Sequence, residues 1–206
     1  GKSKNVWQGK KARTAWMIWR RSLGITSNAD KLKALKSIDL SHLTKAEAKE
    51  FTVLLEELTK REFQEESTST FMHFVKAIWS DFINGDHHVK MAKAFDDIAS
   101  GKLKRLIINM PPRHTKSEFA SHLFPAYLLG KNPKLKIIEA THTADLAVNF
   151  GRKTRDLIDG EEYHKLFPDT ELKADSRSAG KWLTNKGGEY YAAGIGGALA
   201  GRGADL

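Results

Sequence analysis

Cysteine is absent from this 206-residue chain, which excludes disulfide frameworks and thiolate metal sites and fits a reducing intracellular setting. Long apolar runs are missing as well. None approaches the roughly 18 residues that a membrane span requires, so we do not expect a membrane protein. With 40% hydrophobic and 29% charged residues, the composition is that of a globular protein rather than a disordered one.

Proline is scarce and confined to one half of the sequence. All five prolines lie at or after Pro111, so residues 1–110 can form helices without interruption. Residues 1–4 contain neither an initiating Met nor an apolar signal core, and we expect them to be the edge of a fragment.

Acidic residues are missing from the start of the chain. Residues 1–21 contain seven Lys and Arg and no acid, so they carry +7 of the net charge of +9. The other 185 residues carry only +2. A basic segment of this kind is either an arm that contacts the phosphates of DNA or a helix whose charges face only water.

The spacing of apolar residues predicts helices throughout the first hundred residues. Residues 12–23 form a basic amphipathic pattern, and Thr44 with Glu47 predicts a capping box that opens the next helix. A polar break is expected at residues 67–70, and a further helix is expected to end at Gly101. We therefore divide this part into a helical, basic region (1–66) and a helical lead-in (67–101).

Residues 102–206 alternate between strand and helix patterns. The sequence predicts strands at residues 106–108 and 135–140, and helices at residues 117–129, closed by Gly130, and 143–159. Residues 182–184 and 189–193 read as a β-hairpin or a pair of adjacent strands. Alternation of this kind predicts an α/β domain with a parallel sheet and right-handed crossovers, preceded by an all-helical N-terminal region.

Between the first predicted strand and helix stands a candidate phosphate-binding loop, residues 110–117. Lys116 and Ser117 are the pair that the chemistry needs, because a Lys at a helix start neutralises phosphates and the adjacent hydroxyl binds Mg²⁺. Met110 and Thr115 occupy the places of the two usual glycines. The alternative is a Pro-Pro turn in which Ser117 or Thr115 caps an ordinary helix.

Three ordered segments resemble the ATPase domain of the large subunit of tailed-phage terminases. They are KRLIINMPPRHTKSE at residues 104–118, ATHTADLA followed by FGR within 140–152, and GGEYYAAG leading into AGRGADL within 187–206. The family commonly has a Pro-Pro-Arg-x-Gly-Lys-Ser loop and often departs from the standard glycine pattern. Here Thr115 replaces the usual glycine, and Thr strongly disfavours a positive φ.

The resemblance implies a P-loop NTPase core at residues 102–206 that uses ATP and Mg²⁺, with Ser117 on the metal. It implies catalytic roles for Lys116, for Arg113 as a nucleotide sensor, and for Arg202, which would reach a neighbouring subunit's site. The alternative for Arg202 is a solvated loop residue. The implied nucleotide-binding residues are Pro112, Arg113, His114, Thr115, Lys116 and Ser117.

The intact protein that this resemblance implies is a motor that packages double-stranded DNA into procapsids and cuts it with a nuclease domain. Its implied partners are viral DNA, the portal protein, the small terminase subunit and further copies in a ring, in the host cytoplasm and transiently at the portal. No strand ending in paired acids follows the loop within residues 102–206, so we expect this sequence to bind ATP without hydrolysing it.

Other features are ambiguous. His87 and His88 could contact adenine, or be surface or satisfied core residues, and the eight histidines show no spacing suited to a metal. The glycines at residues 194–197 fail the dinucleotide-binding pattern. The three tryptophans within residues 1–21 could stack on bases or pack against protein.

The alternative functions are a helicase-type ATPase and a non-catalytic module that binds DNA or the portal.

Overall fold

The computed structural model describes residues 27–36, 43–197 and 199–206 and divides the chain into two compact units, residues 1–65 and 66–206. The basic helix predicted at residues 12–23 lies outside the described residues. Within these residues, no helix combines the length and the apolar character needed to cross a membrane.

The first unit has a small helical core. Helix α2 (Asn28–Lys36) and helix α3 (Lys45–Ser69) bury Leu32, Leu35 and Phe51. The predicted capping box is confirmed, because the Glu47 carboxylate accepts from the Thr44 N–H (2.8 Å) and the Thr44 hydroxyl accepts from the Glu47 N–H (3.3 Å).

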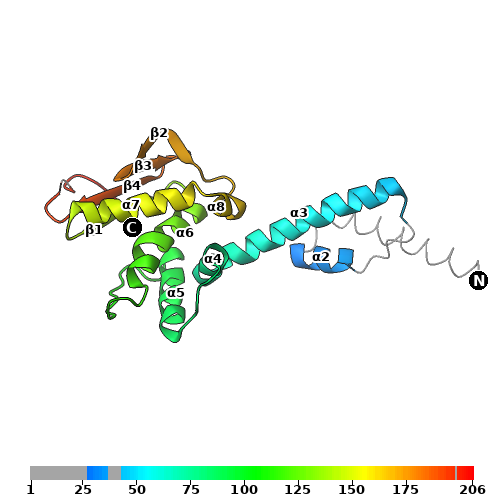
Figure 1. Cartoon of the computed structure of the whole chain (residues 1–206), viewed down its shortest axis with the longest axis horizontal. Coiled ribbons are helices and arrows are strands. Elements are labelled where there is room, and N and C mark those ends of the chain that lie inside the picture. The colour runs from blue at the N-terminus through cyan, green and yellow to red at the C-terminus, as the bar shows by residue number, and fades with distance from the viewer. Residues whose placement is uncertain (1–26, 37–42, 198) are drawn as a thin grey trace, which may run out of the picture. The chain divides into compact units, whose positions relative to one another are not determined.

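The second unit combines helices with one sheet. Its elements are α4 (Phe71–Ile78), α5 (Asp86–Ala99), the π-helix η2 (Glu118–Leu123), α6 (Phe124–Lys131), β1 (Lys136–Thr141), α7 (Ala144–Ile158), α8 (Glu161–Leu166), β2 (Leu172–Ser178), β3 (Lys181–Thr184) and β4 (Glu189–Gly194). Their succession can be followed in Figure 1.

The four strands form an open mixed sheet in the order β1-β4-β3-β2. Strands β1 and β4 pair in parallel, whereas β4 with β3 and β3 with β2 are antiparallel. The predicted α/β class and the pairing of residues 182–184 with 189–193 are therefore confirmed. The expectation of a parallel sheet holds for one pair only, because the short turn between β3 and β4 forces them to run in opposite directions.

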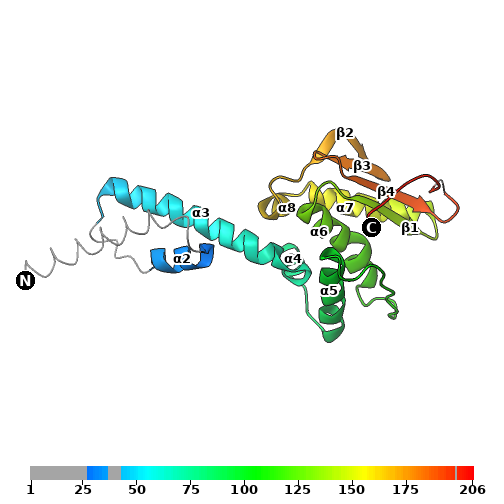
Figure 2. The same cartoon turned by 180° about the vertical axis from the view of Figure 1, so that it is seen from behind.

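Helix α7 packs closely against this sheet, as both views show (Figures 1 and 2). The Trp182 ring stacks on Tyr190 at 4.8 Å, and its indole N–H donates to the carbonyl of Gly151 at 3.1 Å. A Cβ at Gly151 would lie 2.5 Å from the carbonyl oxygen of Ala179, so only glycine allows this approach.

The helices of the second unit share a large aromatic core. Phe71 is fully buried and contacts Phe95, Phe119 and Phe124 edge-on, with ring centroids 5.2 to 5.5 Å apart. Through this core, α4 and α5 support η2 and α6, the helices that follow residues 110–117.

Three expectations about element boundaries are wrong. Residues 106–108 form no strand, and Ile107 is 86% exposed, because no strand of the described residues pairs with this segment. The polar break predicted at residues 67–70 is confined to Thr70: helix α3 continues to Ser69, and the Thr70 hydroxyl caps α4. Gly130 lies inside α6 rather than after it, where a Cβ would collide with the Phe167 ring.

Candidate phosphate-binding site

The loop at residues 110–117 has an unusual backbone. Arg113 has φ 64° and Thr115 has φ 58°, so both adopt the left-handed conformation that favours glycine. For a β-branched residue such as Thr115 this costs about 1–3 kcal/mol and persists only when the surroundings enforce it. The structure thus places Thr115 in the backbone conformation that the usual glycine would adopt without strain.

The helix that follows begins without a capping side chain. Lys116 and Ser117 are helical, and the first helical bond of this entrance runs from the Phe119 N–H to the Thr115 carbonyl at 2.9 Å. Within the described part of the chain, the N–H groups of Lys116, Ser117 and Glu118 donate no hydrogen bond. Free N–H groups at the positive end of a helix dipole favour an anion, and phosphate is a common one.

The side chains at this entrance are also free. Arg113 and Ser117 are exposed and Lys116 is half-buried. In residues 27–36, 43–197 and 199–206, none of the three has a side-chain hydrogen bond or ion pair. Two cations and a hydroxyl therefore stand beside the free N–H groups, a set that fits a phosphate and its Mg²⁺ ion.

The acid that follows Lys116 and Ser117 in the sequence, Glu118, is bound elsewhere. The Glu118 carboxylate contacts His122 Nδ1 at 2.5 Å and Lys153 Nζ at 3.2 Å. The hydrogen bond from His122, together with Lys153, lowers the pKa of Glu118 to about 2 despite its burial. Because Glu118 is held by these partners, it forms no ion pair with Lys116.

A second contact reaches the loop from the start of α5. The His88 ring is buried, and its Nε2 lies 2.6 Å from the Thr115 hydroxyl, which donates to the His114 carbonyl at 2.7 Å. The other ring nitrogen of His88, Nδ1, accepts from the Gly85 N–H at 2.9 Å. Burial, with His87 and His114 nearby, lowers the pKa of His88 from 6.5. Both ring nitrogens are thus bonded within the protein and are not available to adenine.

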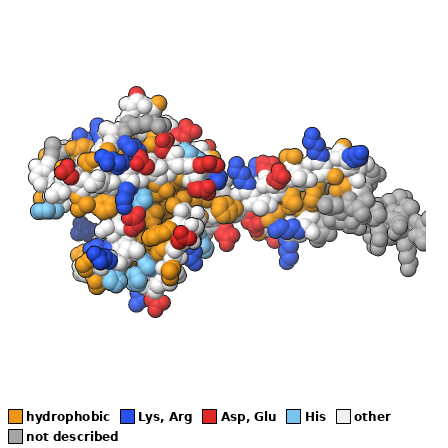
Figure 3. Space-filling view, in the orientation of Figure 1, with side chains coloured by type: hydrophobic (Ala, Val, Ile, Leu, Met, Phe, Trp, Pro, Cys, Tyr) orange, Lys and Arg blue, Asp and Glu red, His pale blue; other side chains and the backbone are white. Residues whose placement is uncertain are grey.

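Histidines and cations gather around this entrance. The rings of His87 and His114 lie 5.9 Å apart, and Figure 3 shows histidine beside Lys or Arg side chains on the lower part of the second unit. In the described ranges, no group of three or more His, Asp or Glu could hold a metal ion. Ser117 as the Mg²⁺ ligand stays a prediction.

Arg202 lies apart from the loop. Its guanidinium donates to the Glu189 carboxylate at 3.2 Å and lies 3.8 Å from the centroid of the Tyr191 ring. Both partners are in the first half of β4, whereas ligands of parallel strands bind beyond their carboxyl ends. The structure does not bring Arg202 together with residues 112–117, and its role at a neighbouring subunit's site stays a prediction.

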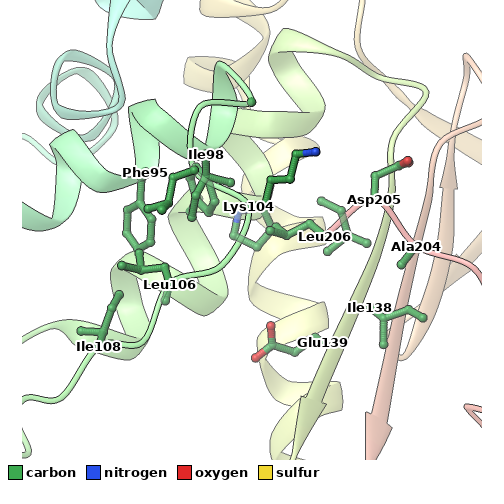
Figure 4. Close-up of a pocket in the computed structure, with 16 residues that line it drawn as sticks. Phe95, Ile98, Lys104, Leu106, Ile108, Ile138, Glu139, Ala204, Asp205 and Leu206 are labelled. Atoms are coloured by element: carbon green, nitrogen blue, oxygen red, sulfur yellow. The ribbon is translucent and has the colours of Figure 1, made fainter.

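A cavity of about 740 Å³ lies between residues 103–108 and β1 (Figure 4). Ile108 and Glu139 line it, and burial raises the pKa of Glu139 to about 7. At one end Leu206 bonds to β1 in a parallel pattern: Ile138 N–H donates to the Leu206 carbonyl at 2.9 Å, and Leu206 N–H donates to the Lys136 carbonyl at 3.3 Å. The free edge of β1 can therefore accept a strand that runs parallel to it.

Comparison with protein-family models, curated proteins and solved structures gives no match.

The sequence pointed to the loop, to Lys116 and to Ser117, but the part played by His88 was missed. His88 and Thr115 are 27 residues apart, so no local pattern joins them. The only local signal was the spacing of Gly85 and His88, which places a histidine at the third helical position, where a side chain can bond back to the N-cap N–H.

Proposed function

We propose that this chain is the ATP-binding part of a P-loop motor ATPase of the terminase large-subunit type. The observation that carries the proposal is the entrance to the helix at Lys116. There a left-handed Thr115, free N–H groups and the unpaired side chains of Arg113 and Ser117 occur together within residues 113–118. This combination provides what a triphosphate requires: backbone donors, neutralising charge and a hydroxyl for the metal.

Each residue has a definite task in this proposal. The free N–H groups of Lys116 and Ser117 bind phosphate oxygens, and the Lys116 ammonium neutralises them. Arg113, exposed beside the loop, adds positive charge where the terminal phosphate would lie. A bound Mg²⁺, held through Ser117, would supply further charge neutralisation at the phosphates.

The rest of the second unit supports the same class of protein. Strands β1 and β4 are parallel, and α7 packs against them. The edge of β1 that faces away from β4 bonds to Leu206. A strand placed there would lie between β1 and residues 103–108, the segment that leads into the loop.

The proposed work of the intact motor is the packaging of double-stranded DNA into a procapsid. This part is supported by the three resembling segments and by the basic residues 1–21, which carry +7 without one acid. The partners we propose are viral DNA, the portal protein, the small terminase subunit and further copies of the chain in a ring.

Titration calorimetry with Mg-ATP on the 206-residue chain tests the ATP site. We expect binding, and we expect Lys116→Ala to weaken it by about 10- to 100-fold, the size of a lost hydrogen bond to a charged group. The matched control is Lys186→Ala, because Lys186 is exposed in the turn between β3 and β4. Absence of binding, or equal affinity in both variants, would contradict the proposal.

A further inference from the structure

The start of α5 and the candidate phosphate loop are joined by a continuous chain of hydrogen bonds. The Gly85 N–H donates to His88 Nδ1, so the ring proton lies on Nε2, which donates to the Thr115 hydroxyl. That hydroxyl in turn donates to the carbonyl of His114. Every donor in this chain has an acceptor, and each group has one possible direction of donation.

The His88 ring has little freedom to leave this position. It is 6% exposed and lies between Phe82 and Phe119, with ring centroids at 4.8 and 5.2 Å. Phe119 belongs to η2, the helix that the loop enters, so His88 contacts both the loop and the helix after it. Rotating the ring would break both of its hydrogen bonds while its nitrogens remained buried.

The bonded hydroxyl belongs to the residue whose backbone is least favourable. Thr115 has φ 58°, and it precedes Lys116 and the free N–H groups of the helix entrance. If Thr115 relaxed to negative φ, the backbone would enter the helix along another path, and the directions of these N–H groups would change. An interaction that fixes its hydroxyl therefore also fixes the geometry of the anion site.

We propose that His88 is a positioning residue that holds Thr115 in its left-handed conformation and thereby sets the affinity of the loop for a nucleoside triphosphate. This inference rests on the proposed function for its ligand. Its structural half, that His88 maintains the loop conformation, can be tested without nucleotide. It also accounts for a loop that carries threonine where glycine would be unstrained.

The experiment uses two substitutions of His88 that separate its two bonds. His88→Asn keeps an acceptor near the position of Nδ1 for the Gly85 N–H but does not reach Thr115. His88→Gln keeps an amide donor near the position of Nε2. Each is made in the wild-type chain and in Thr115→Gly, where the backbone no longer needs support.

In the chain without nucleotide, we expect His88→Asn to accelerate hydrogen exchange of the Phe119 amide, which bonds to the Thr115 carbonyl. His88→Gln should restore the protection at least in part. The imidazole nitrogen shifts of wild-type His88 should show the proton on Nε2. Unchanged exchange in His88→Asn, or a proton on Nδ1, would overturn the inference.

With Mg-ATP, we expect His88→Asn to weaken binding by about tenfold in the wild-type chain, with partial rescue by His88→Gln. In the Thr115→Gly background the same substitution should change affinity by less than about twofold. An equal loss in both backgrounds would show a general effect on folding and overturn the inference. If the wild-type chain binds no Mg-ATP, the proposed function fails, and the exchange measurement alone decides the role of His88.

Discussion

Thr143 and Thr115 each stand before a helix of the second unit, but their hydroxyl groups bond in opposite ways. Thr143 has an extended backbone, φ −120°, and its hydroxyl accepts from the Leu146 N–H at 3.3 Å, which caps α7. Thr115 has φ 58°, and its hydroxyl bonds to His88 and to the preceding carbonyl instead. The first threonine satisfies a helix end, whereas the second leaves a helix end free.

The two edges of β1 differ in the same way. Along one edge, all six residues of β1 pair with β4. Along the other, among the described residues, Lys136 bonds to Asp205 and Leu206, Ile138 bonds to Leu206, and the cavity lies beyond them. Glu139 lines this cavity as a carboxyl group whose pKa burial has raised to about 7.

The second unit therefore has a satisfied side and an open side. The satisfied side holds the capped entrance of α7 and the edge of β1 that pairs with β4. The open side holds a strained Thr115, the unpaired Lys116 and a desolvated Glu139. Departures from local rules that gather in one region are typical of functional sites, where a ligand or a further segment satisfies the groups left free.

The largest effect on stability is expected from Glu139→Gln. Because the folded-state pKa is raised from 4.5 to about 7, the folded chain retains this proton after the unfolded chain has lost it. The free energy of unfolding therefore falls as pH rises between these two values. Glutamine removes that loss, so the variant should be more stable by about 2–3 kcal/mol at about pH 8 and similar to wild type near pH 4.5.

Urea denaturation at both pH values measures this difference. The control is Glu171→Gln, because Glu171 is exposed before β2 and should change the free energy of unfolding by less than about 0.5 kcal/mol. A difference between Glu139→Gln and wild type that does not grow with pH would show that Glu139 is not desolvated.

A smaller effect is expected on the satisfied side, from Thr143→Ala. Removing the hydroxyl leaves the Leu146 N–H without its cap and should lower the free energy of unfolding by about 1 kcal/mol. Thr143→Ser keeps the cap and is the control. Mg-ATP affinity should stay within about twofold of wild type in both variants. A large loss of affinity would mean that the α7 entrance belongs to the binding site.

The satisfied side was also the side that could be predicted from the sequence. Residues 135–140 and 143–159 were placed within a residue or so of β1 and α7, because apolar spacing and the Thr143 cap act locally. The strand predicted at residues 106–108 failed because a strand needs a partner, and no local pattern records whether one is present.

The candidate site was predictable in part. The sequence identified the pair of Lys116 and Ser117. It also showed that Thr115 stands where glycine is usual, which is where the structure has a positive φ. Both features concern adjacent residues. Strand β2 and helix α8 were not predicted. The bond from His88 depends on how α5 packs beside the loop, which only the tertiary structure determines.

The smallest effect on stability is expected from Thr115→Gly, which replaces the strained residue by the one that the backbone conformation favours. Relief of strain stabilises the folded chain. Loss of the hydroxyl bonds and the greater freedom of glycine in the unfolded chain act in the opposite direction. Relief of strain is worth about 1–3 kcal/mol and each opposing contribution about 1 kcal/mol, so the free energy of unfolding should change by less than about 1 kcal/mol.

Mg-ATP affinity of Thr115→Gly should equal or exceed that of wild type, because phosphate would be held mainly by Lys116 and the free N–H groups of the helix entrance. Thr115→Val is the matched variant: it keeps the branched side chain at φ 58° but loses the hydroxyl, so strain remains without its support and affinity should fall. If Thr115→Gly also binds more weakly, by about tenfold, the hydroxyl is itself a ligand of the nucleotide. The Thr115 hydroxyl would then bind a nucleotide, whereas the Thr143 hydroxyl binds the N–H of Leu146.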